Sequence, residues 1–471
     1  MRIPYGKGIE LYCKTPVSIQ KSLGIFMAPI SRSTILGSGF HDALRKLQET
    51  QWYKPAKLRE YQESRLRALV RHAYHNVPYY NRVFKKEKIT PDDIQRVQDL
   101  KKIPILTKTD LRTHFAELIA VNAAEFSYGV SSTSGSTGKP VSFYLDQQNR
   151  EMEYAAKWRQ RNWANLYLNC RIATFRAFRG MRGTKFQNGK PRWIFNALSK
   201  ELEFNIFAIN GANLKRQVEK LKQFNPDIIE GYPSVIELVA KYVLKHDIQC
   251  KSPAAIQTSS ESLGTRRPII EEAFGCKVSD WYGQSEYVVS AGQCPDGKYH
   301  ITESGIMEII KDGEQVSDGE IGEIVGTGLY NYSMPLLRYQ TTDLARCSEE
   351  KCNCGRGMPL VQSIEGRVSD SILSSDGHII TGPVFEHYWK NKITPNASHL
   401  DYVHVIQKPD RKIVLKVVKS NDYPDKETSA IIRGLKEILG EELKIEFVEL
   451  LSVPVQKKWR FSESELNLCL T

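Results

Sequence analysis

Long apolar runs are missing from this chain of 471 residues. No stretch approaches the roughly 18 consecutive apolar residues of a membrane-spanning helix. The apolar segment at residues 23–30 is too short for a signal-peptide core and is followed by Ser and Arg. Internal repeats and low-complexity tracts are also missing. These absences exclude a membrane-spanning or repeat protein and predict a cytoplasmic globular protein.

The composition is ordinary, with 41% hydrophobic and 25% charged residues, and the length predicts two or three domains. The net charge of +12 suits an anionic partner. However, Lys and Arg are mixed with Glu and Asp along predicted helices such as residues 57–65, as on a solvated helix face. We therefore expect no specific nucleic-acid binding.

Residues 131–140 read Ser-Ser-Thr-Ser-Gly-Ser-Thr-Gly-Lys-Pro. The glycines let backbone N–H groups approach phosphate oxygens, the hydroxyls add donors and Lys139 adds charge, which suits the polyphosphate of ATP. A Walker-type loop would need glycine at Thr133 and Ser or Thr at Pro140. Because residues 141–145 then read as a strand, we predict a hairpin turn between strands, with a flexible linker as the alternative.

The middle of the chain predicts an α/β body. Residues 56–115 have helical periodicity with a break at residues 76–80, and residues 147–166 form another predicted helix. Residues 225–282 then alternate buried strands with amphipathic helices, including one from Pro233 to Lys245, which is the signature of a parallel sheet.

Polar residues directly follow two of these predicted strands. Ser259, Ser260 and Glu261 follow one, and Tyr282-Gly-Gln-Ser-Glu286 follows the next. Open α/β sheets bind their ligands at this edge, so the sequence predicts a site there.

Beyond Ser304 the sequence pattern predicts antiparallel strands separated by glycine turns. A small α+β unit is predicted from about Asp370. The predicted fold class is α/β, with parallel sheets and flanking helices, a smaller antiparallel β unit and a small α+β C-terminal domain. The predicted domains are an N-terminal extension at 1–55, a large domain with a helical preface at 56–369 and a small domain at 370–471.

Several motifs in a fixed order carry a family resemblance: the 131–140 loop, Tyr282-Gly-Gln-Ser-Glu286, Arg338-Tyr-Gln-Thr-Thr-Asp343, Gly366-Arg-Val-Ser-Asp370 and a late Lys458. The chain resembles the adenylate-forming superfamily, and within it the phenylacetate-CoA ligase branch, from about residue 60 to 465. Residues 69–80 also resemble members that often accompany capsule and exopolysaccharide biosynthesis.

The resemblance implies a ligase with a mobile C-terminal domain. A carboxylic acid attacks the α-phosphate of ATP, with Mg²⁺ neutralising phosphate charge, to give an acyl-adenylate and pyrophosphate. An acceptor then takes the acyl group. Coenzyme A is the implied thiol acceptor, and an amine, such as an amino sugar or amino acid, is the alternative. A rival from another class is a non-catalytic nucleotide- and zinc-binding scaffold for polysaccharide assembly. Relatives are often dimers, so a homodimer stays an open alternative.

The resemblance also assigns residues to the nucleotide. The phosphate loop comprises Thr133, Ser134, Gly135, Ser136, Thr137, Gly138 and Lys139. Glu286 would bind Mg²⁺, and Asp343 would bind the ribose hydroxyls. Ser260 and Glu261 would line the adenine, and Tyr282 would stack on it. The remaining nucleotide contacts would come from Gly283, Ser285 and Arg367.

Two further roles follow from the same resemblance. Asp370 matches the hinge about which the small domain rotates, and Lys458 matches the catalytic lysine that reaches the carboxylate and α-phosphate. Lys457 stands where the family has glycine, so Lys457 is an alternative to Lys458, and a basic tail is the simpler interpretation. The candidate acid pocket is Phe178, Tyr232 and Pro233.

Nine cysteines without a secretion signal predict reduced thiols. Four soft ligands have spacings that would close a tetrahedral structural Zn²⁺ site, namely Cys294, His300, Cys352 and Cys354. Some relatives show a similar Cys/His set. Cys347 would substitute for one member, and unliganded buried thiols are the alternative. No Cys/His nucleophile pair is evident.

Overall fold

The computed structural model describes residues 32–132, 141–176, 193–197, 199–206, 211–367, 370–375, 377, 379–380, 382–420, 422–442, 444–451 and 461–466. Most of these residues surround one 13-stranded sheet, whose strand order is β12-β11-β13-β14-β15-β10-β9-β8-β7-β6-β3-β5-β4. The bounds are β3 Ile172–Arg176, β4 Trp193–Asn196, β5 Glu201–Asn205, β6 Ile228–Gly231, β7 Ala255–Ser259, β8 Val278–Gly283, β9 Ser290–Gln293, β10 Tyr299–Ile301, β11 Gly305–Lys311, β12 Glu314–Gln315, β13 Ile321–Gly328, β14 Tyr339–Ser348 and β15 Leu360–Arg367.

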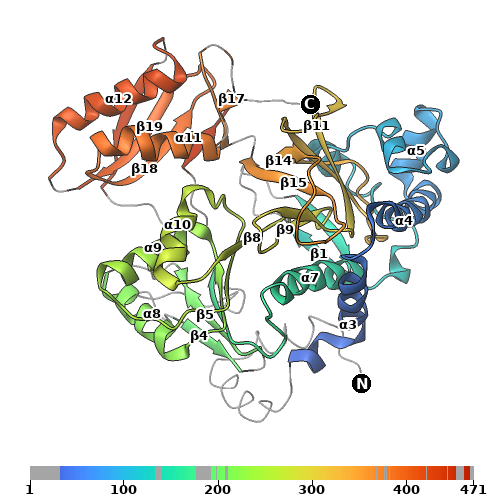
Figure 1. The fold of residues 1–471 in the computed structure, drawn as a ribbon. Helices are drawn as coiled ribbons and strands as arrows, with labels where there is room; N and C mark the ends of the chain where they lie inside the picture. The colour runs from blue at the N-terminus through green and yellow to red at the C-terminus, as the bar shows by residue number, and fades with distance from the viewer. Residues whose placement is uncertain are drawn as a thin grey trace.

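The parallel part of the sheet runs β5-β3-β6-β7-β8. Strands β6 and β7 are buried at every position, as expected for strands covered on both faces. The crossover helices are α8 Gly211–Phe224, α9 Pro233–Lys245 and α10 Arg267–Phe274 (Figure 1). Helix α9 buries Ile236, Val239, Ala240 and Val243, which lie on one helical face.

The antiparallel strands continue the same sheet. Strand β8 pairs antiparallel with β9, and Trp281 lies opposite Gly292. The predicted α/β class with parallel and antiparallel parts is therefore confirmed, although the two parts share one sheet. Strand patterns predict strands and their burial but not which edges pair.

Helices near the N-terminus pack on the sheet and on each other. They are α3 Arg32–Thr50, α4 Pro55–Asn76, α5 Pro78–Lys86, α6 Lys108–Thr113 and α7 Gln147–Asn162. Pro55 and Pro78 occupy first-turn positions, where the missing N–H costs nothing. Leu36, Phe40 and Leu47 of α3 lie in the largest core cluster together with residues of α7, so residues 32–50 pack as part of the large body. The predicted domain boundaries stay predictions.

The hydroxyl-rich segment lies between paired strands. Strand β1 Tyr128–Ser132 pairs antiparallel with β2 Ser142–Asp146, and the last pair is Ser132 with Ser142. The sequence predicted strands on both sides of this segment, whereas a Walker loop is followed by a helix. Residues 133–140 themselves lie outside the described residues.

The C-terminal part has its own core, formed by residues such as Phe385, Val405, Leu415 and Ile431. It contains a four-stranded sheet of order β20-β19-β18-β21 and two α-helices. In Figure 1 these orange and red elements lie beside α9 and α10, on the side of the molecule opposite the blue helices. The bounds are β16 Ile372–Leu373, β17 Ile379–Ile380, α11 Gly382–Tyr388, β18 Leu400–Gln407, β19 Ile413–Lys419, α12 Asp425–Leu439, β20 Ile445–Glu449 and β21 Ser462–Ser464.

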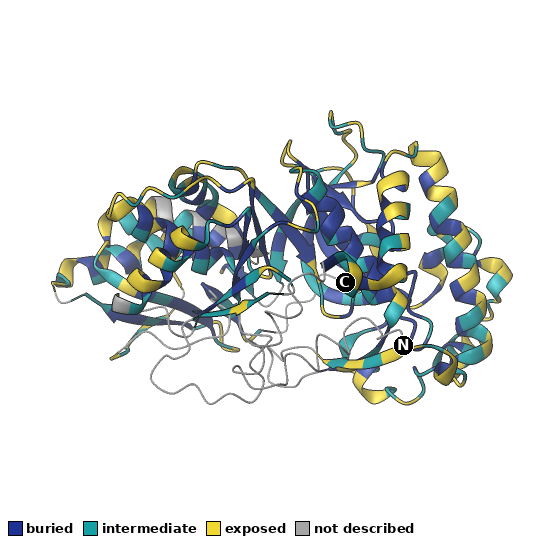
Figure 2. Cartoon of the chain, turned by 90° about the horizontal axis from the view of Figure 1, so that it is seen from below, coloured by how far each residue is buried: buried dark blue, intermediate teal, exposed yellow. Residues whose placement is uncertain are grey.

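Burial follows this architecture. In Figure 2 the buried residues run through the sheets, while exposed residues lie along the outer faces of the helices. Among the helices that the structure describes, none combines the length and apolar character needed to cross a bilayer.

Candidate active site

A cavity of 1320 Å³ opens at the carboxyl ends of β7 and β8 and extends to β14 and β15. It brings together residues that are far apart in the chain. Of the predicted site residues, the following line it: Ser260, Glu261, Tyr282, Gly283, Ser285, Glu286, Asp343, Arg367 and Asp370. The edge of a parallel sheet thus presents polar groups to one cavity, as the sequence predicted.

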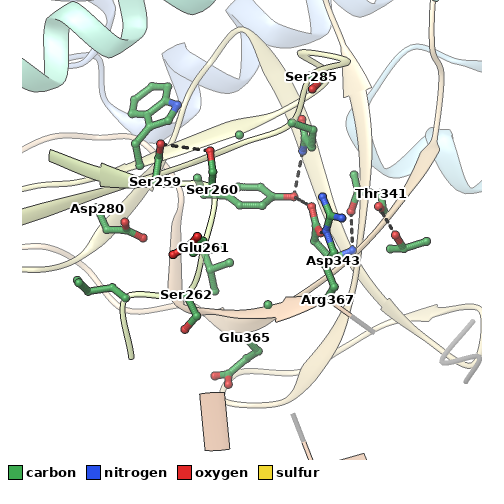
Figure 3. Close-up of a pocket in the computed structure, with 18 of the residues that line it drawn as sticks. Ser259, Ser260, Glu261, Ser262, Asp280, Ser285, Thr341, Asp343, Glu365 and Arg367 are labelled. Carbon is green, nitrogen blue, oxygen red and sulfur yellow. Dashed lines mark hydrogen bonds and ion pairs between the residues drawn. The ribbon is translucent and has the colours of Figure 1, made fainter. Parts of the chain in front are cut away.

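One wall is formed where β7 and β8 end. Ser260 has a φ of 74°, so the chain turns sharply directly after β7. Tyr282 is a buried residue next to the end of β8, and its hydroxyl donates a hydrogen bond to Asp343 Oδ2 at 2.9 Å. Figure 3 shows Ser259 and Ser260 on one side of the pocket and Asp343 with Arg367 on the other. An aromatic face and a carboxylate at this spacing suit a planar base and its sugar hydroxyls.

Asp343 and Arg367 form an ion pair across neighbouring strands. They are register partners on β14 and β15, and Arg367 Nε lies 3.4 Å from Asp343 Oδ1. Burial alone would lower the pKa of Arg367, but Asp343 and Asp370 outweigh it and the pKa is raised. Asp343 also lines the cavity, so its carboxylate oxygens are placed to accept hydrogen bonds from a ligand there.

Glu286 lies on the same wall and is 4% exposed. Its Oε1 accepts a hydrogen bond from the Tyr339 hydroxyl at 2.8 Å. A buried carboxylate lining a polar cavity is a hard oxygen ligand of the kind Mg²⁺ takes, so its donor chemistry fits the predicted role.

Lys108 is a cavity residue that the sequence did not single out. Burial lowers its pKa, although Asp343 and Glu286 oppose that shift. Its Nζ donates to the Thr341 carbonyl at 2.8 Å and to Thr342 Oγ1 at 2.6 Å. The residue begins α6, a single capped turn that in sequence looks like any solvated helix start, so only its tertiary contacts reveal it.

The other predicted site residues are not found among the described residues that line the cavity. The phosphate loop at 133–139, Phe178 and Lys458 lie outside the described residues, as does Lys457. Tyr232 and Pro233 lie at the start of α9. Within the described part of the cavity lining, strand β6 contributes Glu230, whereas Tyr232 and Pro233 are not among the lining residues.

The predicted zinc ligands meet beside the sheet. The ligand atoms of Cys294, His300, Cys352 and Cys354 all lie within 4.8 Å of one another. Cys294 Sγ is 3.6 Å from Cys352 Sγ, and Cys354 Sγ is 3.3 Å from His300 Nε2. Tetrahedral zinc with ~2.3 Å bonds to sulfur needs ligands about this far apart.

The protonation state of His300 also fits a metal ligand. Burial, with Arg356 and Arg159 nearby, lowers the pKa of His300 to about 4, so its imidazole is neutral at pH 7. The cluster joins the end of β9, strand β10 and the loop before β15, and it lies outside the described lining of the cavity. With four protein ligands it has no open coordination position, which is the pattern of a structural site.

Comparisons with known proteins identify relatives of the chain. No protein-family model matches it. It is 29% identical to a phenylacetate-coenzyme A ligase of Thermus thermophilus over 67% of this chain and 72% of that protein. It is 26% identical to the protein CapK of Staphylococcus aureus over 79% of this chain and 80% of that protein. The chain is a relative of the phenylacetate-coenzyme A ligases. The resemblance drawn from the ordered motifs is therefore confirmed.

The fold of this ligase relative matches solved structures as well. A crystal structure of 2-hydroxyisobutyryl-CoA ligase in the postadenylation state superposes with a TM-score of 0.68 at 20% identity, covering 89% of this chain and 92% of that one. The same ligase in the thioesterification state gives a TM-score of 0.58 over the same shares of both chains, also at 20% identity. Both comparisons show the same overall fold.

Proposed function

We propose that the protein activates a carboxylic acid with ATP as an acyl-adenylate and then transfers the acyl group to coenzyme A. The observation that carries the proposal is the convergence of Tyr282, Asp343, Arg367 and Glu286 on one cavity. The similarity to phenylacetate-coenzyme A ligases supports it independently.

The chemistry needs an attacking carboxylate, a held nucleotide and relief of phosphate charge. A carboxylate oxygen forms the bond to the α-phosphorus, the bond from that phosphorus to pyrophosphate breaks, and pyrophosphate leaves with the electron pair. Asp343 would hold the ribose hydroxyls while Tyr282 packs on the base. Bound at Glu286, Mg²⁺ would supply positive charge beside the phosphates. Lys458 would approach the α-phosphate, and Asp370 would serve as the hinge between the two half-reactions.

A second candidate differs only in the acceptor. The alternative to coenzyme A is an amine acceptor in polysaccharide precursor synthesis, which the capsule-like resemblance of residues 69–80 allows. Assaying product formation from the acyl-adenylate with coenzyme A, amino sugars and amino acids separates the two. A homodimer is part of the proposal and is checked by light scattering.

Carboxylate-dependent exchange of pyrophosphate into ATP tests the first half-reaction. We expect exchange that requires Mg²⁺ and at least one acid in a panel of aryl acids, fatty acids, amino acids, sugar acids and dicarboxylic acids. Exchange is the sharpest readout because it needs no acceptor. Tight ATP binding with no exchange for any acid would favour the non-catalytic scaffold instead.

We also propose that the four-ligand cluster holds one structural zinc ion. Purified protein should contain about one zinc per chain, and Cys352→Ser should remove it and lower the melting temperature by ~5 °C, because metal binding adds to folding free energy. Cys347→Ser is the matched control, since Cys347 lies outside the cluster, and it should keep the metal. Equal zinc content in both variants would contradict the assignment.

A further inference from the structure

A group of buried charges lines the cavity beyond β7, away from Tyr282. Lys157 and Arg161 project from α7, Arg176 ends β3, and Glu230 lies on β6. Lys157 Nζ lies 3.0 Å from Glu230 Oε1, and Arg176 Nη2 lies 3.4 Å from the same oxygen. The Arg161 guanidinium bonds the other carboxylate oxygen. We call these four residues the cationic cluster.

The cationic cluster has more positive than negative charge in direct contact. Three cations share one carboxylate, and their side chains are 14% exposed for Lys157, 3% for Arg161 and 14% for Arg176. Arg161 Nη1 and Arg176 Nε have no hydrogen-bond partner among the described residues. Buried cations without full compensation are costly, so an anion entering here would be stabilised.

Two other acids lie close by and interact electrostatically with the cluster, Glu153 with Lys157 and Glu201 with Arg161, but their hydrogen bonds go to other residues. Glu201 Oε1 accepts a hydrogen bond from Thr174 Oγ1 at 2.6 Å, and Glu153 Oε2 accepts one from Ser290 Oγ at 2.8 Å. Burial raises the pKa of Glu153 to about 7, so this group is partly neutral near physiological pH. Burial and then the charge of Arg176 lower the pKa of Lys157 to about 7, and Glu230 opposes that shift.

The location separates the cationic cluster from the proposed nucleotide contacts. Along the sheet order β8-β7-β6-β3, Glu230 and Arg176 lie two and three strands from Tyr282, a span of roughly 10 to 15 Å at the usual strand spacing. Arg176 Nη2 donates to Ser259 Oγ at 2.7 Å, so the cluster is continuous with the wall that ends β7. With the nucleotide bound near Tyr282, the part of the acyl-adenylate nearest the cationic cluster would therefore be its acyl group.

We propose that the acid activated by this protein carries a second anionic group, such as a second carboxylate, which the cationic cluster binds at the end of the cavity away from Tyr282. The proposal rests on the proposed function, because it describes the acid subsite of the same cavity. An apolar acid would leave Lys157 and the two arginines desolvated with Glu230 as the single carboxylate in direct contact. A dicarboxylate would reach the α-phosphate with one end and the cluster with the other.

Pyrophosphate exchange with paired acids tests the proposal. Each dicarboxylic acid of three to six carbons is compared with its own monoamide, which has the same size but lacks the second charge, and a phosphonocarboxylate distinguishes a carboxylate from a phosphorus-centred anion. We expect the best doubly charged acid to have a kcat/KM about 100-fold above its monoamide, because its second anionic group would form charge-assisted hydrogen bonds with the cluster. Lys157→Met should remove most of that ratio.

Controls keep the outcomes distinct. Arg176→Gln, at the cluster's edge, should reduce the same ratio if Lys157→Met fails to fold, and Lys277→Gln, which alters an exposed lysine paired with Glu271, should leave it unchanged. Titration of the doubly charged acid into protein with a non-hydrolysable ATP analogue should show proton uptake near pH 7, because the bound anion raises the pKa of Lys157.

Three results would overturn the proposal. Exchange with apolar or singly charged acids alone would reject the second anionic group while leaving ATP-dependent activation intact. An equal rise in KM for ATP with every acid in Lys157→Met would assign the cluster to the nucleotide. Absence of exchange with any acid would reject both this proposal and the function on which it rests.

Discussion

Replacing Asp343 by Asn should lower kcat/KM for ATP by about 30- to 1000-fold, since losing one partner of a buried charged hydrogen bond costs about 2–4 kcal/mol. The variant keeps the size of the side chain but removes the charge that Arg367 and the proposed ribose hydroxyls share. Pyrophosphate exchange measured against ATP concentration gives the value.

A substrate analogue shows whether the loss belongs to the ribose. Wild-type protein should discriminate strongly against 2′,3′-dideoxy-ATP, whereas Asp343→Asn should use ATP and the analogue almost equally. Asp312→Asn is the control, because Asp312 lies in an exposed hairpin turn with a φ of 52° that Asn also tolerates. If Asp343→Asn still discriminates as strongly as wild type, the ribose assignment is wrong.

Glu303→Gln should lower the free energy of unfolding by about 3–5 kcal/mol, a large effect for a single substitution. Glu303 is 0% exposed and accepts hydrogen bonds from Arg159 Nη1 at 2.7 and 2.8 Å, and the Thr50 hydroxyl also donates to it. Arg159, itself 1% exposed, would keep its charge with no carboxylate to neutralise it. The midpoint of urea unfolding measures the effect.

The chain offers a matched exposed pair for comparison. Glu60 lies 2.9 Å from Arg67 and its side chain is 67% exposed, so Glu60→Gln should cost at most about 1 kcal/mol. Replacing both partners, as Arg159→Met with Glu303→Leu, should recover part of the stability because no buried charge is left unpaired. Equal unfolding midpoints for Glu303→Gln and Glu60→Gln would refute the argument.

Much of the fold could be predicted because local signals agree with the tertiary structure. Helix α9 has the predicted bounds, from Pro233 to Lys245, since a first-turn proline and one continuous apolar face define it. Strand β2, which pairs with β1, followed from the strand pattern after Pro140. The grouping of the four Cys and His ligand atoms followed from their type and spacing.

Other features depend on contacts that no local pattern encodes. Glu153, Lys157 and Arg161 recur every four residues on α7, which in sequence is typical of a solvated helix face. In the structure that face lies against the sheet ends, so the same charges are buried in the cavity. The pairing of β8 with β9, which joins the parallel and antiparallel parts, likewise depends on tertiary contacts that the strand pattern does not encode.

At the junction between the large body and the C-terminal part, one buried arginine pairs with a carboxylate from each side. Arg266, 3% exposed, lies just before α10 and contacts Glu386 of α11 at 2.7 Å. It also contacts Glu237 of its own body at 3.0 Å. If the C-terminal part rotates during catalysis, Arg266 keeps one carboxylate and Glu386 gains water. Such a rotation would leave neither surface with an isolated charge in a dry environment.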